Sequence, residues 1–405
     1  MNRVYSRIEH KTGRIHAVLW VNRFPIGIAL AIRIGLSTWL AVIWAIVDPY
    51  RPIFDDIMSK VFGHLTPSPT ILGRALIDVW LRWDAIHFMN IAKVTYFELG
   101  KGDLNYFPLY PYMTRLLSIN NTIDITVLGL LISTVASVFA FVIFYNLVLT
   151  AFNNENLAKW SVLIWAIYPT SFFLFAPYSD ALFSVFTLGC LFMLYKEKWI
   201  FSGVLASFAG LTRAQGILLI IPIASSLLIN RRNNSNKILK IVGATIMAAV
   251  GSASYLLWRS QITDHLFSGY ATFSRRSIVN PFVAVIHVIN QAFTTRSPYV
   301  FADVLSIVFF GLVIAYMLYT KIFRDQVVLL IYTIITFAAF IPWYSDVVSS
   351  YQSATRYVIS LYPAFIAIAY ILINARPTLR FLYTALSIAG FMVASALFAL
   401  WIFVG

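Results

Sequence analysis

The chain has 405 residues, of which 60% are hydrophobic and 11% are charged, and its mean hydropathy is +0.80. Soluble domains contain about 45–50% apolar and about 25% charged residues, so this composition excludes a soluble globular protein. Apolar stretches of about 20 residues recur along the chain. They predict one all-α polytopic membrane domain over residues 1–405 and argue against a membrane β-barrel, whose strands would alternate in short segments.

The formal net charge of +14 does not predict a nucleic-acid partner, because the basic residues are scattered between apolar spans. Membrane topology explains them better. Residues 1–25 carry five basic residues against one acid, which predicts a cytoplasmic N-terminus. The long connections 48–123 and 260–302 then face the exoplasmic side together with most of the acids. Cys190, the single cysteine, lies in an apolar span and is interpreted as a packing residue.

Span length and alternating sides predict about eleven membrane helices. In chain order they lie near 26–47, 124–149, 160–176, 179–195, 199–211, 215–230, 238–259, 303–320, 326–342, 356–374 and 380–404. The fifth is short for a membrane span. An alternative is therefore a broken or re-entrant hairpin over residues 199–230, with its turn at Thr212 and Arg213.

The first long connection contains a segment from Ile71 to Tyr96 with helical periodicity, which predicts a helix along the membrane interface. Its predicted apolar face carries Leu81, Ala85, Met89 and Ala92. Its predicted polar face carries Asp84, His87 and Asn90. Acids at membrane depth are expensive and tend to be functional.

Two interpretations of Asp84 stay open at this point. As a general base, its carboxylate would accept a proton from an attacking hydroxyl. As a structural residue, it would be solvated or would pair with Arg82 or Arg115. His87 is expected to position a substrate or Asp84 rather than bind a metal, because the sequence offers no set of ligands around it.

Aromatic residues and prolines alternate from Asn105 to Pro111, and the two prolines oppose a continuous helix there. Tyr106 and Tyr110 could stack on sugar faces and donate hydrogen bonds, as aromatic rings in binding sites do. An aromatic belt at the membrane interface explains the same residues equally well.

Three further charged residues interrupt apolar stretches. Asp180 either caps a helix or binds substrate hydroxyls. Arg213 requires a partner, which could be a lipid phosphate, a substrate phosphate or Asp180. Arg356 begins a late helix, where it either pairs with Asp346 or joins Arg213 in an anion site. The charged residues Asp264, His265, Arg275 and Arg276 are more typical of a solvated basic loop than of a substrate site.

Five motifs along the chain together resemble the PIG-V family of mannosyltransferases, within the GT-C superfamily of membrane glycosyltransferases. They run in family order from Arg82 to Pro363. The motifs are Arg82-Trp83-Asp84-Ala85-Ile86-His87-Phe88, Tyr106-Phe107-Pro108-Leu109-Tyr110-Pro111, Pro177-Tyr178-Ser179-Asp180-Ala181-Leu182-Phe183, Thr212-Arg213-Ala214-Gln215-Gly216, and Arg356-Tyr357-Val358 with Tyr362-Pro363. Asp180 stands where the family has Glu, and Ala214-Gln215 where it has Ser-Asn.

The resemblance implies a GT-C fold and an inverting transfer of mannose from a polyprenyl-phosphate or dolichyl-phosphate donor to a lipid-linked or glycan acceptor on the exoplasmic face. It implies that Asp84 is the general base and that Arg213 and Arg356 hold the carrier phosphate. The other residues expected to bind substrate are His87, Asn90, Tyr106, Tyr110, Asp180, Gln215 and Tyr357. Neither a metal nor another cofactor is expected.

Three alternatives to this function stay open. A transporter or lipid flippase would also carry charges inside a helical bundle. A scaffold subunit would keep Asp84 only for stability, and a related enzyme would use another sugar. The expected location is a prokaryotic plasma membrane, although the endoplasmic reticulum also fits.

Overall fold

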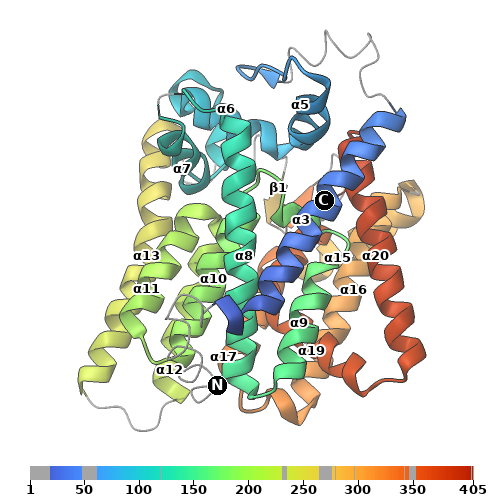
Figure 1. The fold of residues 1–405 in the computed structure, drawn as a ribbon. Coiled ribbons are helices and arrows are strands. Elements are labelled where there is room, and N and C mark those ends of the chain that lie inside the picture. Colours follow the sequence, from blue (N-terminus) through green and yellow to red (C-terminus); the bar gives the residue numbers. More distant parts are fainter. Residues whose placement is uncertain are drawn as a thin grey trace.

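The computed structural model describes residues 19–47, 62–119, 121–229, 235–263, 276–278, 280–295, 297–341, 343–345, 353–402 and 404. These residues form a bundle of helices, which confirms the all-α membrane fold (Figure 1). Within these described ranges, five helices are long and apolar enough to cross a membrane. They are α3 (Arg23–Val47), α8 (Ile125–Phe152), α13 (Ser235–Thr263), α16 (Pro298–Tyr319) and α20 (Pro377–Ala399).

A sixth span is obtained if one bent pair of helical segments counts as a single crossing, with a bend of 82°. The pair consists of α18 (Ala354–Tyr357) with η8 (Val358–Ser360), followed by α19 (Tyr362–Asn374). Other helices of the bundle are shorter: α9 (Glu155–Ala166), α10 (Asp180–Tyr195), α11 (Trp199–Thr212), α12 (Ile220–Ile229), α15 (Pro281–Thr295) and α17 (Val327–Phe340). The count of eleven full spans is therefore not confirmed.

The predicted break at Thr212 and Arg213 is present. Helix α11 ends there, Arg213 is extended, and the 3-10 helix η6 (Ala214–Leu219) leads into α12. Gly216 of η6 packs directly on α11, because a Cβ at this position would lie 2.3 Å from the backbone nitrogen of Gly210. This close approach holds the turn, and with it Arg213, against the bundle interior.

The single helix expected from Ile71 to Tyr96 is instead three pieces: α5 (Ile71–Leu76), η2 (Asp78–Trp80) and α6 (Asp84–Val94). Trp83 interrupts it with a φ of 53°, a backbone conformation that a helix does not contain. Asp78 also bonds outside the helix, because its carboxylate accepts a hydrogen bond from the backbone N–H of Ser68. The interruption makes Asp84 the first residue of a helix.

The expected apolar face of α6 is buried, with Ala85, Met89 and Ala92 fully covered. Helix α6 is followed by η3 (Tyr96–Glu98), η4 (Lys101–Asn105) and α7 (Leu109–Leu117). In Figure 1, α5, α6 and α7 lie together at one end of the bundle, beside the end of α8. We call this the α6 end of the molecule.

Two short strands, β1 (Arg276–Ile278) and β2 (Trp343–Ser345), form an antiparallel pair that the sequence analysis did not predict. Further along the chain, the 3-10 helices η5 (Ser171–Leu174) and η7 (Lys321–Phe323) precede α10 and α17. Helix α9 ends ten residues before the predicted position 176, and η5 fills part of that stretch.

A buried aromatic group connects α8, α9 and α19. The ring of Trp165 lies 5.0 Å from that of Phe141, 5.3 Å from that of Phe144 and 5.3 Å from that of Tyr362. Its indole N–H donates to the carbonyl of Ile359, at 2.9 Å. Because Ile359 lies in η8, directly after α18, this packing fixes the position of the segment that carries Arg356.

Candidate active site

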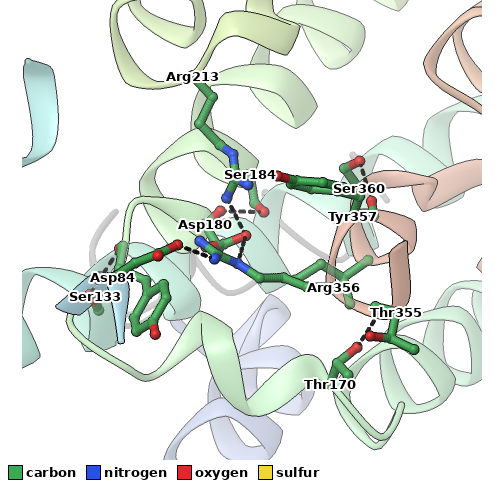
Figure 2. Close-up of polar contacts among 12 residues, drawn as sticks. Asp84, Ser133, Thr170, Asp180, Ser184, Arg213, Thr355, Arg356, Tyr357 and Ser360 are labelled. Carbon is green, nitrogen blue, oxygen red and sulfur yellow. Dashed lines mark hydrogen bonds and ion pairs between the residues drawn. The ribbon is translucent and has the colours of Figure 1, made fainter. Parts of the chain in front are cut away.

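Four charged side chains from distant parts of the sequence meet at the α6 end of the bundle. Asp84 begins α6, Asp180 begins α10, Arg213 lies between α11 and η6, and Arg356 lies in α18. Figure 2 shows the four side chains pointing toward one another. We call them the charge cluster.

Arg356 joins the two acids of the charge cluster. Its Nη1 lies 2.5 Å from Oδ2 of Asp84, and its Nη2 lies 2.7 Å from Oδ2 of Asp180. Its Nε also donates to Asp180, at 3.1 Å from Oδ2. The two-pronged contact with Asp180 uses the planar geometry of the guanidinium, which a lysine could not reproduce.

Arg213 forms an ion pair with the other oxygen of Asp180, through Nη1. Its guanidinium carbon lies 5.5 Å from the centre of the Tyr357 ring and 5.9 Å from that of Phe183. No described residue accepts a hydrogen bond from the remaining nitrogens of Arg213. These nitrogens are the donors that the cluster leaves available for a ligand.

Two aromatic rings pack near the guanidinium of Arg356. Its guanidinium carbon lies 4.5 Å from the ring centre of Tyr178 and 5.0 Å from that of Phe173. The Tyr178 hydroxyl donates to the carbonyl oxygen of Arg82 at 2.8 Å. Tyr178, which the sequence analysis did not assign to the site, thus connects the segment before Asp84 to the arginine that contacts Asp84.

The four side chains differ in exposure. Those of Arg356, Asp180 and Arg213 retain 5%, 6% and 13% of their accessible surface, whereas Asp84 retains 35%. Asp84 is therefore the member of the charge cluster that a substrate can reach most easily. Loss of contact with water tends to raise the pKa of this carboxyl, but the Arg356 guanidinium outweighs it, and the net pKa lies below the ordinary value. Asp84 is ionised at neutral pH.

The structural pairings considered for Asp84 do not occur, because both neighbouring arginines bind backbone carbonyls. Arg82 donates to the carbonyls of Asp78, Leu81 and Ala399. Arg115 donates to those of Ala92 and Lys93.

His87 lies beside Asp84 and pairs with Asp103, with 2.7 Å between Nδ1 and Oδ1. The imidazole stacks on the Tyr106 ring at a centroid distance of 4.7 Å, and the Tyr106 hydroxyl donates to Oδ1 of Asp84 at 3.2 Å. Burial tends to lower the pKa of His87, but the hydrogen bond and charge of Asp103 outweigh it and the net pKa is raised. Sequence spacing gave no signal for Asp103, because the loop through η4 brings it back to α6.

Two expected substrate residues point away from the charge cluster. The Asn90 side chain donates to the carbonyl of Phe62 and accepts from the backbone N–H of His64. The Tyr110 hydroxyl is fully buried, where it donates to the carbonyl of Gly129 and contacts Ser133. Asn90 thus joins α6 to residues 62–64, and Tyr110 holds α7 against α8.

The other expected residues are placed as follows. Gln215 is partly buried in η6, two residues after Arg213, and Tyr357 lies under the Arg213 guanidinium. The carboxylate of Asp180 accepts from the two arginines and not from backbone amides, so it does not cap α10. Asp264, His265, Arg275 and Asp346 lie outside the described residues, and Arg276 pairs with Ser345 in the small sheet. Within the described ranges, no three His, Cys, Asp or Glu side chains are grouped as metal ligands would be.

Comparison of the whole bundle with solved structures finds the crystal structure of ArnT from Cupriavidus metallidurans bound to undecaprenyl phosphate. The match covers 95% of this chain and 76% of ArnT, with a TM-score of 0.51 and 11% sequence identity. Such a distant likeness shows a shared fold, of the GT-C type, and does not identify a substrate.

Sequence comparison finds curated relatives at greater similarity. GPI mannosyltransferase 2 of Schizosaccharomyces pombe is 26% identical over 188 residues, which are 45% of this chain and 40% of the relative. GPI alpha-1,6-mannosyltransferase 2 of Rattus norvegicus is 28% identical over 184 residues, which are 42% of this chain and 37% of the relative. The matches therefore span about two fifths of the length of these relatives.

The family model described as Mannosyltransferase (PIG-V) matches residues 40–259, more than half of the chain. The matched range contains Asp84, Asp180 and Arg213, three of the four members of the charge cluster. The order of motifs, the shared fold and this match agree, and the chain belongs to the PIG-V mannosyltransferase family.

Proposed function

We propose that the protein transfers a mannosyl residue from a polyprenyl-phosphate donor to a hydroxyl of a lipid-linked or glycan acceptor, with inversion at the anomeric carbon. The observation that carries this proposal is the charge cluster itself. It presents an ionised and accessible carboxylate, Asp84. In the same cluster, Arg213 has guanidinium nitrogens that donate to no described residue.

Asp84 is the general base in this proposal. Its carboxylate accepts the proton of the acceptor hydroxyl while the hydroxyl oxygen bonds to the anomeric carbon. The bond between that carbon and the phosphate oxygen breaks, and the lipid phosphate leaves with the electron pair. The proton then passes from Asp84 to solvent or to the released phosphate, which restores the carboxylate.

The departing phosphate gains negative charge as its bond to the sugar breaks, so a fixed cation nearby favours the reaction. Arg213 suits this role because part of its guanidinium has no hydrogen-bond acceptor among the described residues. Arg356 donates to Asp84 and Asp180 through all three nitrogens, so its principal role is to hold the base in place.

His87 and Tyr106 form the wall next to the base. The His87 side chain is 38% exposed and stacked on Tyr106, whose hydroxyl contacts the carboxylate. An acceptor hydroxyl that approaches Asp84 therefore meets the imidazole edge, which can orient it by a hydrogen bond. We assign the positioning of the acceptor to His87 and the positioning of Asp84 to Tyr106.

The proposal includes no metal or other cofactor, because a monophosphate leaving group can be neutralised by the guanidinium of Arg213. It places the α6 end on the exoplasmic side, in keeping with the basic short connections of the sequence. A prokaryotic plasma membrane is the proposed location, with membrane lipids as surroundings and no nucleic-acid partner.

The decisive experiment is mannose transfer by the purified protein in liposomes, with labelled polyprenyl-phosphate mannose and a nucleotide-activated mannose as parallel donors. We expect label to move from the lipid donor to an acceptor, with no transfer from the nucleotide sugar. Transfer should continue in the presence of a chelator. Movement of lipid across the bilayer without sugar transfer would instead identify a transporter or flippase.

Arg213→Gln tests the phosphate contact separately. Loss of a charge-assisted contact of this kind costs about tenfold in affinity, so the KM for the lipid donor should rise by about that factor while the acceptor KM stays unchanged. An Arg213→Gln enzyme with unchanged donor KM would remove Arg213 from the phosphate site.

A further inference from the structure

A second candidate site lies outside the charge cluster and contains the partly buried arginine Arg33. A cavity of about 340 Å³ opens between α3, the end of α5 and the first turns of α8. It is lined by Arg33, Leu76, Ile77, Val127, Leu130, Leu131 and Thr134. We call it the Arg33 pocket. Five of these seven side chains are apolar, so the pocket combines one cationic side chain with a hydrophobic lining.

Arg33 lies inside α3, a helix that otherwise reads as an apolar membrane span. Its Nη1 donates to the carbonyl of Phe175 at 2.9 Å, and its guanidinium carbon lies 5.0 Å from the ring centre of Trp80. No carboxylate of a described residue lies within ion-pair distance of it. One carbonyl and one ring orient the guanidinium without neutralising it.

An unneutralised arginine at membrane depth is costly, and in membrane proteins such residues mark sites for charged partners. The other polar lining residue, Thr134, is uncharged, and its hydroxyl donates to the carbonyl of Leu130 at 2.7 Å. Within the described part of the chain, no residue therefore supplies the counter-charge, and a ligand can supply it. A phosphate group matches the forked donors of a guanidinium in both charge and shape.

The apolar wall indicates what the phosphate is attached to. Leu131 and Val127 are 55% and 39% exposed on the outer side of α8, so the pocket opens on the face that the bundle presents to lipid. A free inorganic anion would gain nothing from this surface, whereas acyl chains would cover it. We propose that the Arg33 pocket binds an anionic glycerophospholipid, with its phosphate on Arg33 and its chains along Val127 and Leu131.

The pocket adjoins the segment that leads to the base. Trp80, over which Arg33 lies, is fully buried and precedes Asp84 by four residues. Phe175, which accepts the hydrogen bond from Arg33, follows Phe173, which packs on Arg356. A bound lipid would therefore stabilise the two segments behind the charge cluster without entering it.

The test is native mass spectrometry of the full-length protein from mixed bilayers of phosphatidylglycerol and phosphatidylcholine. We expect the protein to retain phosphatidylglycerol in preference. Arg33→Gln keeps a donor for the Phe175 carbonyl but removes the charge, and should weaken phosphatidylglycerol retention by about tenfold. The matched control is Arg23→Gln, which removes a cation from the end of the same helix, where Arg23 lies over Trp20 and lines no part of the pocket.

A second variant keeps the charge of Arg33 and fills part of the Arg33 pocket. Leu131→Trp fills the mouth of the pocket from an exposed position, so it should fold and should also lose the lipid. Added inorganic phosphate should displace none of the retained phosphatidylglycerol. The proposal fails if the unaltered protein shows no preference for the anionic lipid, if Arg33→Gln retains it as well as Arg23→Gln does, or if inorganic phosphate displaces it. None of these outcomes depends on mannosyl transfer.

Discussion

Asp84 and Asp180 occupy equivalent local positions with different surroundings. Each is the first residue of its helix, and each accepts a hydrogen bond from Arg356. Asp180 is 6% exposed and is held between two arginines, whereas Asp84 is 35% exposed and is held by Arg356 and the Tyr106 hydroxyl. The comparison separates a carboxylate that organises the site from one that can act on a substrate.

The difference follows from what each helix packs against. Helix α10 lies in the middle of the bundle against α8 and α11, so its first residue is covered from all sides. Helix α6 lies at the end of the bundle, after the interruption at Trp83. Burial makes an unpaired charge expensive, so Asp180 requires both guanidiniums, while Asp84 can lose contacts at lower cost.

Asp84→Asn is the strongest test of this division. Because an amide cannot accept the acceptor proton, kcat for mannosyl transfer should fall by about 10²–10⁴, the usual contribution of a general base. Thermal stability should change little, since Arg356 keeps its two contacts with Asp180. The assay is transfer from polyprenyl-phosphate mannose together with a thermal unfolding curve. Full activity in this variant would remove Asp84 from the role of base.

Asp124→Asn is the matched control for this substitution. Asp124 caps α8 by accepting from the backbone N–H groups of Thr126 and Val127, and an asparagine caps a helix equally well. The control should therefore retain both activity and stability.

Asp180→Asn should have the opposite balance. Removing one partner of a buried ion pair costs about 3–5 kcal/mol, because the remaining charges stay buried without compensation. The free energy of unfolding should fall by about that amount, and activity should fall with it as Arg356 and Arg213 lose their common partner. Unfolding by heat or denaturant in detergent measures the change. A variant as stable as Asp84→Asn would contradict the structural role of Asp180.

Sequence reasoning anticipated the centre of the site because buried charges demand partners. Arg213 in an apolar stretch needed an anion, and Asp180 was one of the three partners considered for it. Asp84 and Arg356 were candidates from their positions beside apolar spans, and the family resemblance added the expected roles of base and phosphate ligand. The ion pair between those two was not anticipated, because 272 residues separate them and no periodicity relates them.

The sequence was less informative where the chain does not follow a regular period. The break at Trp83 depends on a positive φ that the motif does not announce, so the helix from Ile71 was predicted too long. Asn90 and Tyr110 were expected to bind substrate from residue type and motif. Their hydrogen bonds to the backbone carbonyls of Phe62 and Gly129 depend on how the first long connection folds, which pattern alone cannot show.

The ion pair of His87 and Asp103 lies beside Asp84, and its strength depends on pH because the imidazole of His87 titrates. The folded-state pKa of His87 is raised above its ordinary value of about 6.5, so the stability from this pair is fully present below that pH. It is lost as the pH rises through the folded-state pKa. Asp103→Asn should therefore lower the melting temperature by about 1–2 °C in acid and by less above neutral pH, because the pair is partly exposed.

Melting curves at a series of pH values, for the unaltered protein and for Asp103→Asn, measure this dependence. His87→Gln should abolish it, since no imidazole remains to titrate. If the difference in melting temperature between the unaltered protein and Asp103→Asn grew as the pH rose, the pair would not stabilise the protonated histidine.

Tyr106→Phe should have the smallest effect. The substitution removes the hydroxyl that donates to Asp84 but keeps the ring that stacks on His87. A single hydrogen bond of this kind is worth about 1 kcal/mol, so kcat should fall about fivefold while KM stays unchanged, because the bond positions the base and does not bind substrate. Tyr110→Phe is the matched control: its hydroxyl bonds only within the bundle, so stability should fall without this selective loss of kcat. Equal kcat losses in the two variants would show that the Tyr106 hydroxyl acts only through folding and does not position Asp84.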